Sequence, residues 1–442
     1  MARPHSAEHA TEADPYLPPD GSELLALMAR LYPICRSITG PGVRETLRIL
    51  SEIVPLEINE VPTGTPVLDW TVPREWVIRD AWVKDGEGRR IIDFRRSNLE
   101  VVGYSVPVHR TVDVTELREH VHSLPDRPDW VPYRTSYYRE TWGFSAPQRV
   151  VDALPDGEYE VAIDADLIEG SLTYGELFVP GETTDEVLFS THICHPSLAN
   201  DNLTGMVVAA HLAAWVASAR RRFGYRFVFV PGTIGAITWL SRNERILPRI
   251  RHGLVLAGLG DAGPATYKRT IDGDVGTDRI VERVLAESGE QTVVLDWDPW
   301  GYDERQYDSP GFRLPVGRLS RTRHGTYPEY HTSADDLDFI IPSQVTASLD
   351  LCQTIVEAFE RDRRWVNLSP KGEPQLGRRG LYGSVGGGSG PAASELAMLW
   401  VLALADGSRS LLDISDRSGV PIAEIDAAAD ALVAAELLGP AD

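Results

Sequence analysis

Apolar positions along this chain follow two periods, and the region from about residue 150 to 370 alternates between them. Short apolar runs such as "EVLFS", "YRFVFV" and "HGLVLAGL" are typical of buried strands. Between them lie longer segments with apolar residues at helical spacing, such as "LTGMVVAAHLAAWVASARR" and "TDRIVERVLAES". Strand, helix and strand in this order predict crossover units, and therefore an α/β fold with a mainly parallel or mixed sheet and helices on both faces.

The N-terminal part has a different pattern. Residues 1–20 are polar and contain proline, so we expect a loose tail. Residues 23–53 carry apolar positions at helical spacing, interrupted at "YPICRSITGPG", which predicts two helices. Residues 61–125 contain aromatic and β-branched runs broken by turns, and "KDGEG" is a hairpin signal between two of these runs. A small β-rich domain is expected there.

The C-terminal segment has a helical pattern again. It predicts one helix in "PAASELAMLWVLALADG", a second helix that ends at Gly419 and a third helix that opens at Pro421. Helix, glycine-containing turn and helix resemble a winged helix-turn-helix. The last helix is acidic and lacks Lys and Arg, whereas phosphate contacts dominate nucleic-acid affinity. We therefore expect a protein-contact module, with homo-oligomer formation as one role and a DNA-binding regulator as the alternative.

Composition narrows the classes of partner. The 442 residues include 65 acidic and 43 basic residues, a formal net charge of -22, which argues against nucleic acid and anionic membranes as partners. Three widely spaced cysteines do not predict a disulfide framework. Neither a signal peptide nor a membrane span is expected from the apolar runs, so a cytoplasmic location is predicted. The glycine run at 383–390 follows no strand and predicts a linker, not a phosphate loop.

The candidate chemistry lies at the predicted strand ends, where ligands bind in such sheets. The segment "VLFSTHICHPSLANDNLTG" places His192, Cys194, His195 and Asp201 after one strand, while Asp261 follows another strand. The late loop "YPEYHTSADDLDFI" adds a further histidine, His331. His and Asp on separate elements are the ligand types of a zinc site that keeps one position open. Each histidine alone could equally be a hydrogen-bonded core or loop residue. An alternative to the metal site is a Cys194 thiol that acts as a nucleophile.

Several motifs together resemble a known family. "LYPICRSITGPGVRETL", "VPTGTPVLDWTVPREW", "VPYRTSYYRETWGF", "HICHPSLANDNLTG", "YDERQYDSPGFRLPVG" and "YPEYHTSADDLDFI" are similar to an aminopeptidase-like family related to the co-catalytic zinc aminopeptidases. Its members combine a hydrolase domain with an inserted β domain and a C-terminal winged helix. The resemblance implies the following domains: a zinc aminopeptidase-like domain at 21–60 and 126–370, the β insertion at 61–125, a linker at 371–390 and the winged helix at 391–442.

The resemblance also implies site residues. His192, Asp201, Asp261 and His331 would be the metal ligands, with Asp201 able to bridge two ions. One zinc ion is expected, with a second as the alternative. His195 would be an extra ligand or a supporting group. Cys194 stands where the zinc aminopeptidases have an aspartate, which is a departure from their pattern.

A larger departure lies in "FVFVPGTIGAITWL". Gly232 and Thr233 take the positions of the two glutamates that serve the zinc aminopeptidases as general base and metal ligand. Glu304, Asp303 and His195 are the candidates to replace the base. We therefore expect a zinc-dependent hydrolase of an amide or ester in a small peptide-like metabolite, in secondary-metabolite or polysaccharide biosynthesis. The alternative is a metal-binding pseudoenzyme or a small-molecule binding protein.

Overall fold

The computed structural model describes residues 16–137, 139–382 and 393–441. It divides the chain into two compact units, Met1–Gln353 and Thr354–Asp442, which are described separately. Most of the expected tail at 1–20, and all of the glycine run at 383–390, lie outside the described residues. Within the described part, no helix combines the length and the apolar character needed to cross a membrane.

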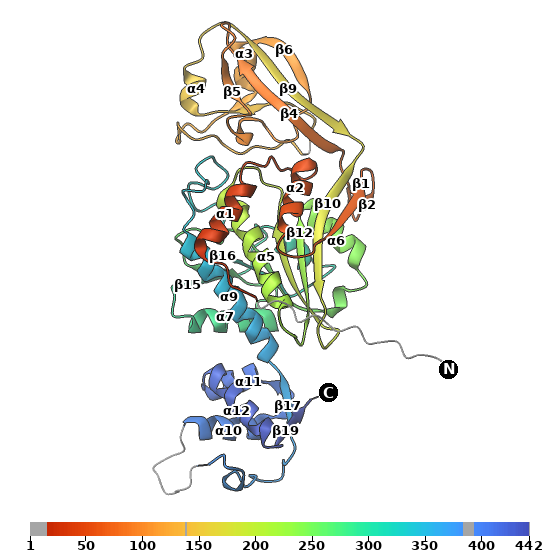
Figure 1. Ribbon diagram of the computed structural model, residues 1–442, viewed down its shortest axis with the longest axis vertical. Coiled ribbons are helices and arrows are strands. Elements are labelled where there is room, and N and C mark those ends of the chain that lie inside the picture. Colours follow the sequence, from red (N-terminus) through yellow and green to blue (C-terminus); the bar gives the residue numbers. More distant parts are fainter. Residues whose placement is uncertain (1–15, 138, 383–392, 442) are drawn as a thin grey trace, which may run out of the picture. The chain divides into compact units, whose positions relative to one another are not determined.

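An eight-stranded sheet forms the centre of the first unit, in the order β1-β10-β12-β11-β13-β16-β14-β15 (Figure 1). Its middle strands β12, β11, β13 and β16 are parallel, whereas β1 and β10 pair antiparallel at one side. The bounds are β1 Glu57–Pro62, β10 Ser171–Val179, β11 Glu186–His192, β12 Gly224–Val230, β13 Ile250–Leu256, β14 Ala265–Lys268, β15 Thr292–Leu295 and β16 Val316–Ser320. The mixed sheet predicted from the apolar runs is confirmed.

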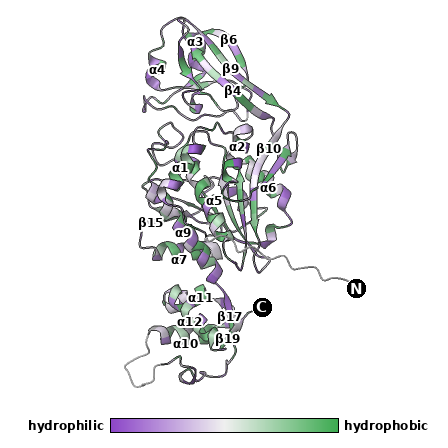
Figure 2. Cartoon of the chain, viewed as in Figure 1, coloured by the Kyte–Doolittle hydropathy of each residue, from purple (hydrophilic) through white to green (hydrophobic). Residues whose placement is uncertain are grey.

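Burial explains why these runs form central strands. Every residue of β11 and β12 is buried, which requires cover on both faces and suits continuous apolar runs. Helix α5 is itself almost wholly apolar and contacts β11, β12 and β13, and Figure 2 shows the hydrophobic colouring of this region. The sequence therefore places a largely apolar helix next to fully buried strands.

The helices of this unit follow the predicted segments. The two N-terminal helices are confirmed as α1 and α2, and Asp20 caps the first through the backbone N–H groups of Ser22 and Glu23. The bounds are α1 Gly21–Leu31, α2 Pro41–Leu50, α5 Thr204–Ala217, α6 Ile234–Asn243, α7 Gly276–Glu287, α8 Glu304–Tyr307 and α9 Pro342–Arg361, with short helical turns at Ala199–Leu203 and Leu247–Arg249.

A four-stranded antiparallel sheet, in the order β5-β4-β9-β6, forms the β-rich region. The "KDGEG" hairpin joins β4 to β5, as predicted. The bounds are β4 Glu75–Lys84, β5 Arg90–Asp93, β6 Val108–Asp113 and β9 Glu158–Ile168, accompanied by α3 Val114–Glu119, α4 Gln148–Asp152, Asn98–Glu100 and the short pairs β2 Pro66–Val67 with β3 Trp70–Thr71 and β7 Val121–His122 with β8 Phe144–Ser145. The expected end at residue 125 is too early, because β9 pairs with both β4 and β6.

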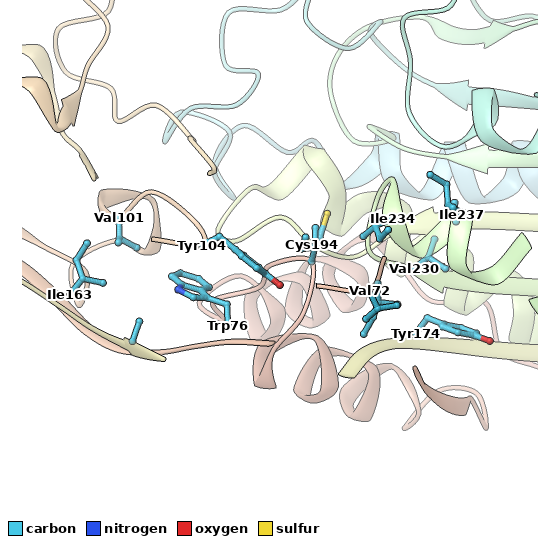
Figure 3. Packing of buried hydrophobic residues seen from close by; sticks show 14 of the residues in the cluster. Val72, Trp76, Val101, Tyr104, Ile163, Tyr174, Cys194, Val230, Ile234 and Ile237 are labelled. Atoms are coloured by element: carbon cyan, nitrogen blue, oxygen red, sulfur yellow. The ribbon is translucent and has the colours of Figure 1, made fainter. Parts of the chain in front are cut away.

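The two sheets of the first unit share one buried hydrophobic cluster (Figure 3). Trp76 of β4 and Tyr104, which follows β5, stack with ring centres 5.9 Å apart. The same cluster contains Cys194, two residues after β11, and Val230, the last residue of β12. The β-rich region therefore packs onto the end of the large sheet where the candidate residues lie.

Among its described residues, the second unit contains the end of α9, three further helices and a three-stranded sheet, with its own core. The bounds are β17 Arg364–Asn367, α10 Ala393–Leu404, β18 Asp406–Ser410, α11 Leu411–Ser418, α12 Ile422–Ala434 and β19 Leu438–Pro440, with a short turn at Gly377–Arg379. Gly419 ends α11 with a φ of 71°, as its position after the predicted helix suggested. The expected start at 391 is too late, because β17 is the central strand of this sheet.

Candidate metal centre

The candidate site begins where β11 ends at His192, and Asp201 follows in the helical turn that leads into α5. The backbone N–H groups of Asn200 and Asp201 donate to the carboxylate of Asp335, over 2.6 and 3.0 Å. The Asn202 amide donates to the Thr191 hydroxyl at 2.8 Å and to the His192 carbonyl at 3.2 Å. The first bonds join the loop to the segment that carries Asp335, and the second join it to the end of β11, so the position of Asp201 is set by its neighbours.

Three imidazoles surround the carboxylate of Asp201. His192 Nε2 lies 2.8 Å from Oδ1, while His195 Nδ1 and His331 Nε2 lie 3.2 and 3.0 Å from Oδ2. We call these four residues, His192, His195, Asp201 and His331, the histidine cluster. Asp201 and His192 are fully buried, whereas the His331 side chain is 32% exposed. The cluster therefore opens towards solvent on the side of His331.

One contact of the histidine cluster, His192 Nε2 to Asp201 Oδ1 at 2.8 Å, is a hydrogen bond, whereas the contact between Asp201 and His331 is not. Asp201 Oδ2 and His331 Nε2 are buried, and neither makes a hydrogen bond within the described part of the chain, although the two atoms lie 3.0 Å apart. Atoms that converge without hydrogen-bond alignment are arranged like ligands around a shared ion. Ligand atoms of His192, His195 and Asp201 all lie within 4.8 Å of one another, and imidazole nitrogen with carboxylate oxygen is a donor set that zinc takes.

Charge and burial act in opposite directions at this site. Burial alone would raise the pKa of Asp201, but the surrounding imidazoles hold that pKa well below its usual range. Burial lowers the pKa of His192 and of His331, so both favour the neutral form that binds metals. For His195, the Asp201 carboxylate outweighs burial and raises the pKa. The centre thus consists of one stable carboxylate and at least two neutral imidazoles.

Aromatic hydroxyl groups complete the surroundings of the histidine cluster. The Tyr302 hydroxyl donates to Asp201 Oδ1 at 2.9 Å, and its ring stacks on His192 with centres 4.6 Å apart. The Tyr133 ring meets His195 and His331 edge-on at 5.1 Å. Sequence reasoning did not single out Tyr302, Tyr133 or Asp335. Each lies within a motif quoted for the family resemblance, and this was the available signal.

His331 is held by a distant segment of the chain. Its φ of 56° is a left-handed conformation that residues other than glycine rarely adopt, and such outliers gather at functional sites. The Tyr133 N–H donates to the His331 carbonyl at 2.8 Å, and the Val131 N–H donates to the Ser333 hydroxyl at 2.9 Å. The segment around Val131 therefore fixes the backbone that presents the last imidazole.

Asp261, predicted as a ligand, does not join the histidine cluster in the structure. Its carboxylate accepts hydrogen bonds from the Asn200 amide at 2.8 Å, the Thr322 hydroxyl at 2.5 Å and the Gly263 N–H at 2.7 Å. Both oxygens are therefore already engaged by neighbours that anchor the loop before α5. The geometry gives this residue a supporting role and does not support its assignment as a ligand.

Asp303 lies beside Gly232, the position at which the family resemblance leads us to expect a glutamate base. A Cβ atom built on Gly232 would lie 3.6 and 3.7 Å from the two Asp303 oxygens, and 3.2 Å from the His192 Cβ. Neither oxygen of Asp303 has a hydrogen-bond partner among the residues described. Burial, with the neighbouring Glu304 charge, raises the pKa of Asp303 to about 8. This carboxyl occupies the space that the absent side chain would enter.

Glu304 and Cys194 do not face the histidine cluster as reactive groups. Glu304 Oε1 lies 3.1 Å from Lys268 Nζ in a fully buried ion pair, so the structure does not support its prediction as a base. Cys194 Sγ points to the Gly232 carbonyl at 3.7 Å, and burial raises the pKa of its thiol to about 12. A thiol with this pKa is inert at neutral pH, which argues against the nucleophile alternative. His195 contacts Asp201 directly, so it belongs with the candidate ligands.

Comparison with known proteins gives matches over most of the chain. Residues 25–362 match the family described as "Domain of unknown function (DUF4910)", and residues 363–440 match a winged helix-turn-helix family. A protein of Clostridium acetobutylicum, named as a candidate polysaccharide biosynthesis protein with an aminopeptidase-like domain, is 49% identical over 418 residues. That alignment covers 95% of this chain and 96% of the relative.

Solved structures agree with the predicted architecture. The crystal structure of a candidate peptidase from Clostridium acetobutylicum has a TM-score of 0.89 at 48% identity and covers 95% of this chain and 96% of that chain. A zinc aminopeptidase from Bacillus subtilis has a TM-score of 0.57 at 13% identity and covers 77% of this chain and 95% of that chain. At that identity the second likeness concerns the fold alone. The aminopeptidase-like α/β fold with a C-terminal winged helix is thereby confirmed.

Proposed function

Because the chain belongs to the aminopeptidase-like family described as "Domain of unknown function (DUF4910)", we propose that it is a metal-dependent hydrolase of the aminopeptidase type. The observation that carries this proposal is the convergence of three imidazoles on the Asp201 carboxylate, with Asp201 Oδ2 and His331 Nε2 left without hydrogen bonds in the described chain. The substrate would be an amide or ester of a small peptide-like metabolite.

Zinc is the cation that we propose for the histidine cluster. His192, Asp201 and His331 would hold it, since imidazole and carboxylate are common zinc ligands, and three protein ligands leave one position open for water or substrate. His195 would support Asp201 or replace one of the three. When bound, such an ion supplies a Lewis acid that polarises a carbonyl group and acidifies water. Asp335 and Asn202 keep the ligand loop in place through their hydrogen bonds. One ion accounts for all four residues of the cluster.

Asp303 is the group that we propose for proton transfer. It lies beside Gly232, where the resemblance locates the base of the zinc aminopeptidases, and it is not engaged by another described side chain. In this role its carboxylate accepts a proton from the attacking water and returns it to the leaving amine. A general base works best when its pKa is close to the working pH, and the raised pKa of Asp303 is consistent with this requirement.

The place of the reaction in metabolism is a further part of the proposal. The relative from Clostridium acetobutylicum carries polysaccharide biosynthesis in its name, and it aligns over nearly the full length of both chains. We propose that this chain acts in a similar biosynthetic setting, on a small metabolite and not on a protein. Its net charge of -22 favours substrates that are neutral or cationic as a whole.

A second candidate function is supported by Gly232. The loss of the glutamate at this position is what a metal-binding protein without hydrolytic activity would tolerate. The two candidates share the metal and differ in turnover. Protein purified without added metal should contain about one zinc per chain, and it should release alanine from alanylalanine if the first proposal holds. Zinc without cleavage of dipeptides, amides or esters supports the second candidate, and the absence of zinc contradicts both.

For the C-terminal unit we propose a protein-contact role. Helix α12 carries Glu424, Asp426 and Asp430 and no Lys or Arg, which opposes approach to the phosphates of nucleic acid. Deleting residues 363–442 should change the mass measured by light scattering while the zinc content stays the same. Tight binding of duplex DNA by the full chain at moderate salt would contradict this role.

A further inference from the structure

A second buried polar cluster lies beside the histidine cluster. Lys268 ends β14 and Arg318 lies on β16, and the two residues are partners in the antiparallel pairing of these strands. Glu304 at the start of α8 and His324 after β16 complete the group. We call Lys268, Glu304, Arg318 and His324 the arginine cluster. The first three side chains are 1% exposed, and His324 is 5% exposed.

The positive charges of the arginine cluster are not balanced. Lys268 Nζ donates to the Asp298 carbonyl at 2.6 Å, to the Trp300 carbonyl at 2.9 Å and to Glu304 Oε1 at 3.1 Å. Arg318 Nη1 lies farther from the same oxygen, at 3.6 Å. Glu304 is thus the fully buried carboxylate that serves both cations, and the lysine is its closer partner. The partly exposed Asp298 carboxylate also lies 3.8 Å from Lys268 Nζ, but it pairs more closely with Arg323, at 2.8 Å. A net positive charge remains on fully buried side chains.

Hydrogen bonding shows which atoms of the arginine cluster lack a partner. Arg318 Nη1 donates to His324 Nδ1 at 2.7 Å, and because a guanidinium cannot accept, this imidazole is neutral and carries its hydrogen on Nε2. Arg318 Nε, Arg318 Nη2 and His324 Nε2 have no hydrogen-bond partner within the described residues. Glu304 Oε2 also lacks one. Three donor atoms and one acceptor atom are therefore without partners. Because buried polar atoms are normally hydrogen-bonded, this excess of donors points to a negatively charged ligand.

The unused donors lie one tyrosine ring away from the metal ligands. The Arg318 guanidinium carbon is 5.6 Å from the centre of the Tyr302 ring, and the His324 ring centre is 5.0 Å from it. The hydroxyl of the same tyrosine donates to Asp201 at 2.9 Å. Trp300, which is 64% exposed, stacks with His324. The arginine cluster therefore lies between the proposed reaction centre and an exposed aromatic side chain.

We infer that Arg318 and His324 form a subsite for a carboxylate group of the substrate. A guanidinium presents parallel N–H groups that match the two oxygens of a carboxylate, and Arg318 has both Nε and Nη2 unused. The substrate class is then a small peptide-like metabolite with a free carboxylate near the bond that is cleaved. This inference rests on the proposed hydrolase function, and it names a feature that the substrate must have.

Binding of two matched probes tests this subsite without relying on turnover. Calorimetry on the full chain, before and after zinc is removed with a chelator, compares alanylalanine with alanylalanine amide. Wild type should bind the free carboxylate about tenfold more tightly than the amide in both states, because a hydrogen bond to a charged group is lost in the amide. Arg318→Gln should remove this difference, whereas the control Arg321→Gln should keep it. Arg321 is also buried, but its guanidinium is bonded to Ser348 and the Gly263 carbonyl.

The outcomes separate the subsite from the hydrolase proposal. If wild type discriminates between the probes but cleaves neither, the subsite stands and the hydrolase proposal fails. Equal binding of both probes by wild type, or an unchanged preference in Arg318→Gln, overturns the subsite, and so does tighter binding of inorganic phosphate than of alanylalanine. Should Arg318→Gln fail to fold by circular dichroism, Arg318→Lys keeps the charge without the planar fork, and it must show a reduced preference.

Discussion

The histidine cluster and the arginine cluster are both buried polar groups that border Tyr302. They differ in the kind of partner that is missing. In the histidine cluster, Asp201 Oδ2 and His331 Nε2 lie 3.0 Å apart and neither has a hydrogen bond within the described residues. In the arginine cluster, N–H donors outnumber the acceptors that remain. Because buried polar groups are normally satisfied, the missing partner indicates the charge of the ligand: a cation for the first cluster and an anion for the second.

Removal of the central carboxylate should have the largest effect. Asp201→Ala takes away the one negative charge of the histidine cluster, so we expect zinc to fall from about one ion per chain to none. Elemental analysis of the purified variant measures this. Cys194→Ala is the matched control from the same loop and should keep its zinc, because its sulfur faces the Gly232 carbonyl and not the imidazoles. Equal zinc content in wild type and Asp201→Ala would contradict the inference that the histidine cluster, unlike the arginine cluster, binds a cation.

Exchange of the proposed base should lower activity without moving the metal. Asp303→Asn keeps the size of the side chain and removes its basicity, so kcat for alanylalanine should fall about 10²- to 10⁴-fold at constant zinc content. Gly232→Glu alone should give no gain, since its side chain would enter the space beside Asp303. The double variant should recover activity relative to Asp303→Asn. Undiminished kcat in Asp303→Asn would assign the proton transfer to another group.

The two cations of the arginine cluster should differ in their effect on stability. Lys268→Met leaves Glu304 and two backbone carbonyls without their main donor, so the free energy of unfolding should fall by about 3–5 kcal/mol. Arg318→Met leaves the pair of Lys268 and Glu304 intact and should cost less. Urea unfolding followed by circular dichroism measures both losses. A larger loss for Arg318→Met would mean that the guanidinium serves the fold and not a ligand.

The smallest effect concerns pH. Burial, and then the Arg318 and Lys268 charges against those of Glu304 and Asp201, lowers the pKa of His324 from 6.5 to about 4. Between these values the unfolded chain binds the proton and the folded chain does not, so wild-type stability falls as the pH drops from 6.5 towards 4. His324→Gln should flatten this part of the curve of unfolding free energy against pH. An unchanged slope would show that His324 is already protonated in the folded chain.

The periodicity of apolar residues was enough to predict the large sheet, the N-terminal helices and the hairpin, because each depends on local pattern and on burial. The start and end of the β-rich region were harder to predict. Strand β9 lies far along the chain from β4, and only the antiparallel pairing itself shows that the two strands belong together. In the C-terminal unit, β17 is likewise separated from its partners by more than thirty residues.

The candidate site was predictable in its residue types and less so in their roles. Asp201 and Asp261 both follow strands. Only the folded arrangement shows that the Asp261 carboxylate already accepts hydrogen bonds from Asn200 and Thr322. Asp303 and Glu304 are neighbours in sequence and point into different surroundings, one beside Gly232 and one against Lys268. The direction in which each of these side chains points depends on how the short helix packs, and a single sequence does not reveal that packing.

The hydrogen bonds from Val131 and Tyr133 to the His331 loop have a consequence for the newly made protein. His192, His195 and Asp201 leave the ribosome together, whereas His331 follows about 130 residues later. At a synthesis rate of about 5–20 residues per second, the first three residues of the histidine cluster wait roughly 6 to 26 seconds for the fourth. Until then the segment around Tyr133 lacks its hydrogen-bond partners in the His331 loop, so the proposed metal site is complete only once residue 331 has been made.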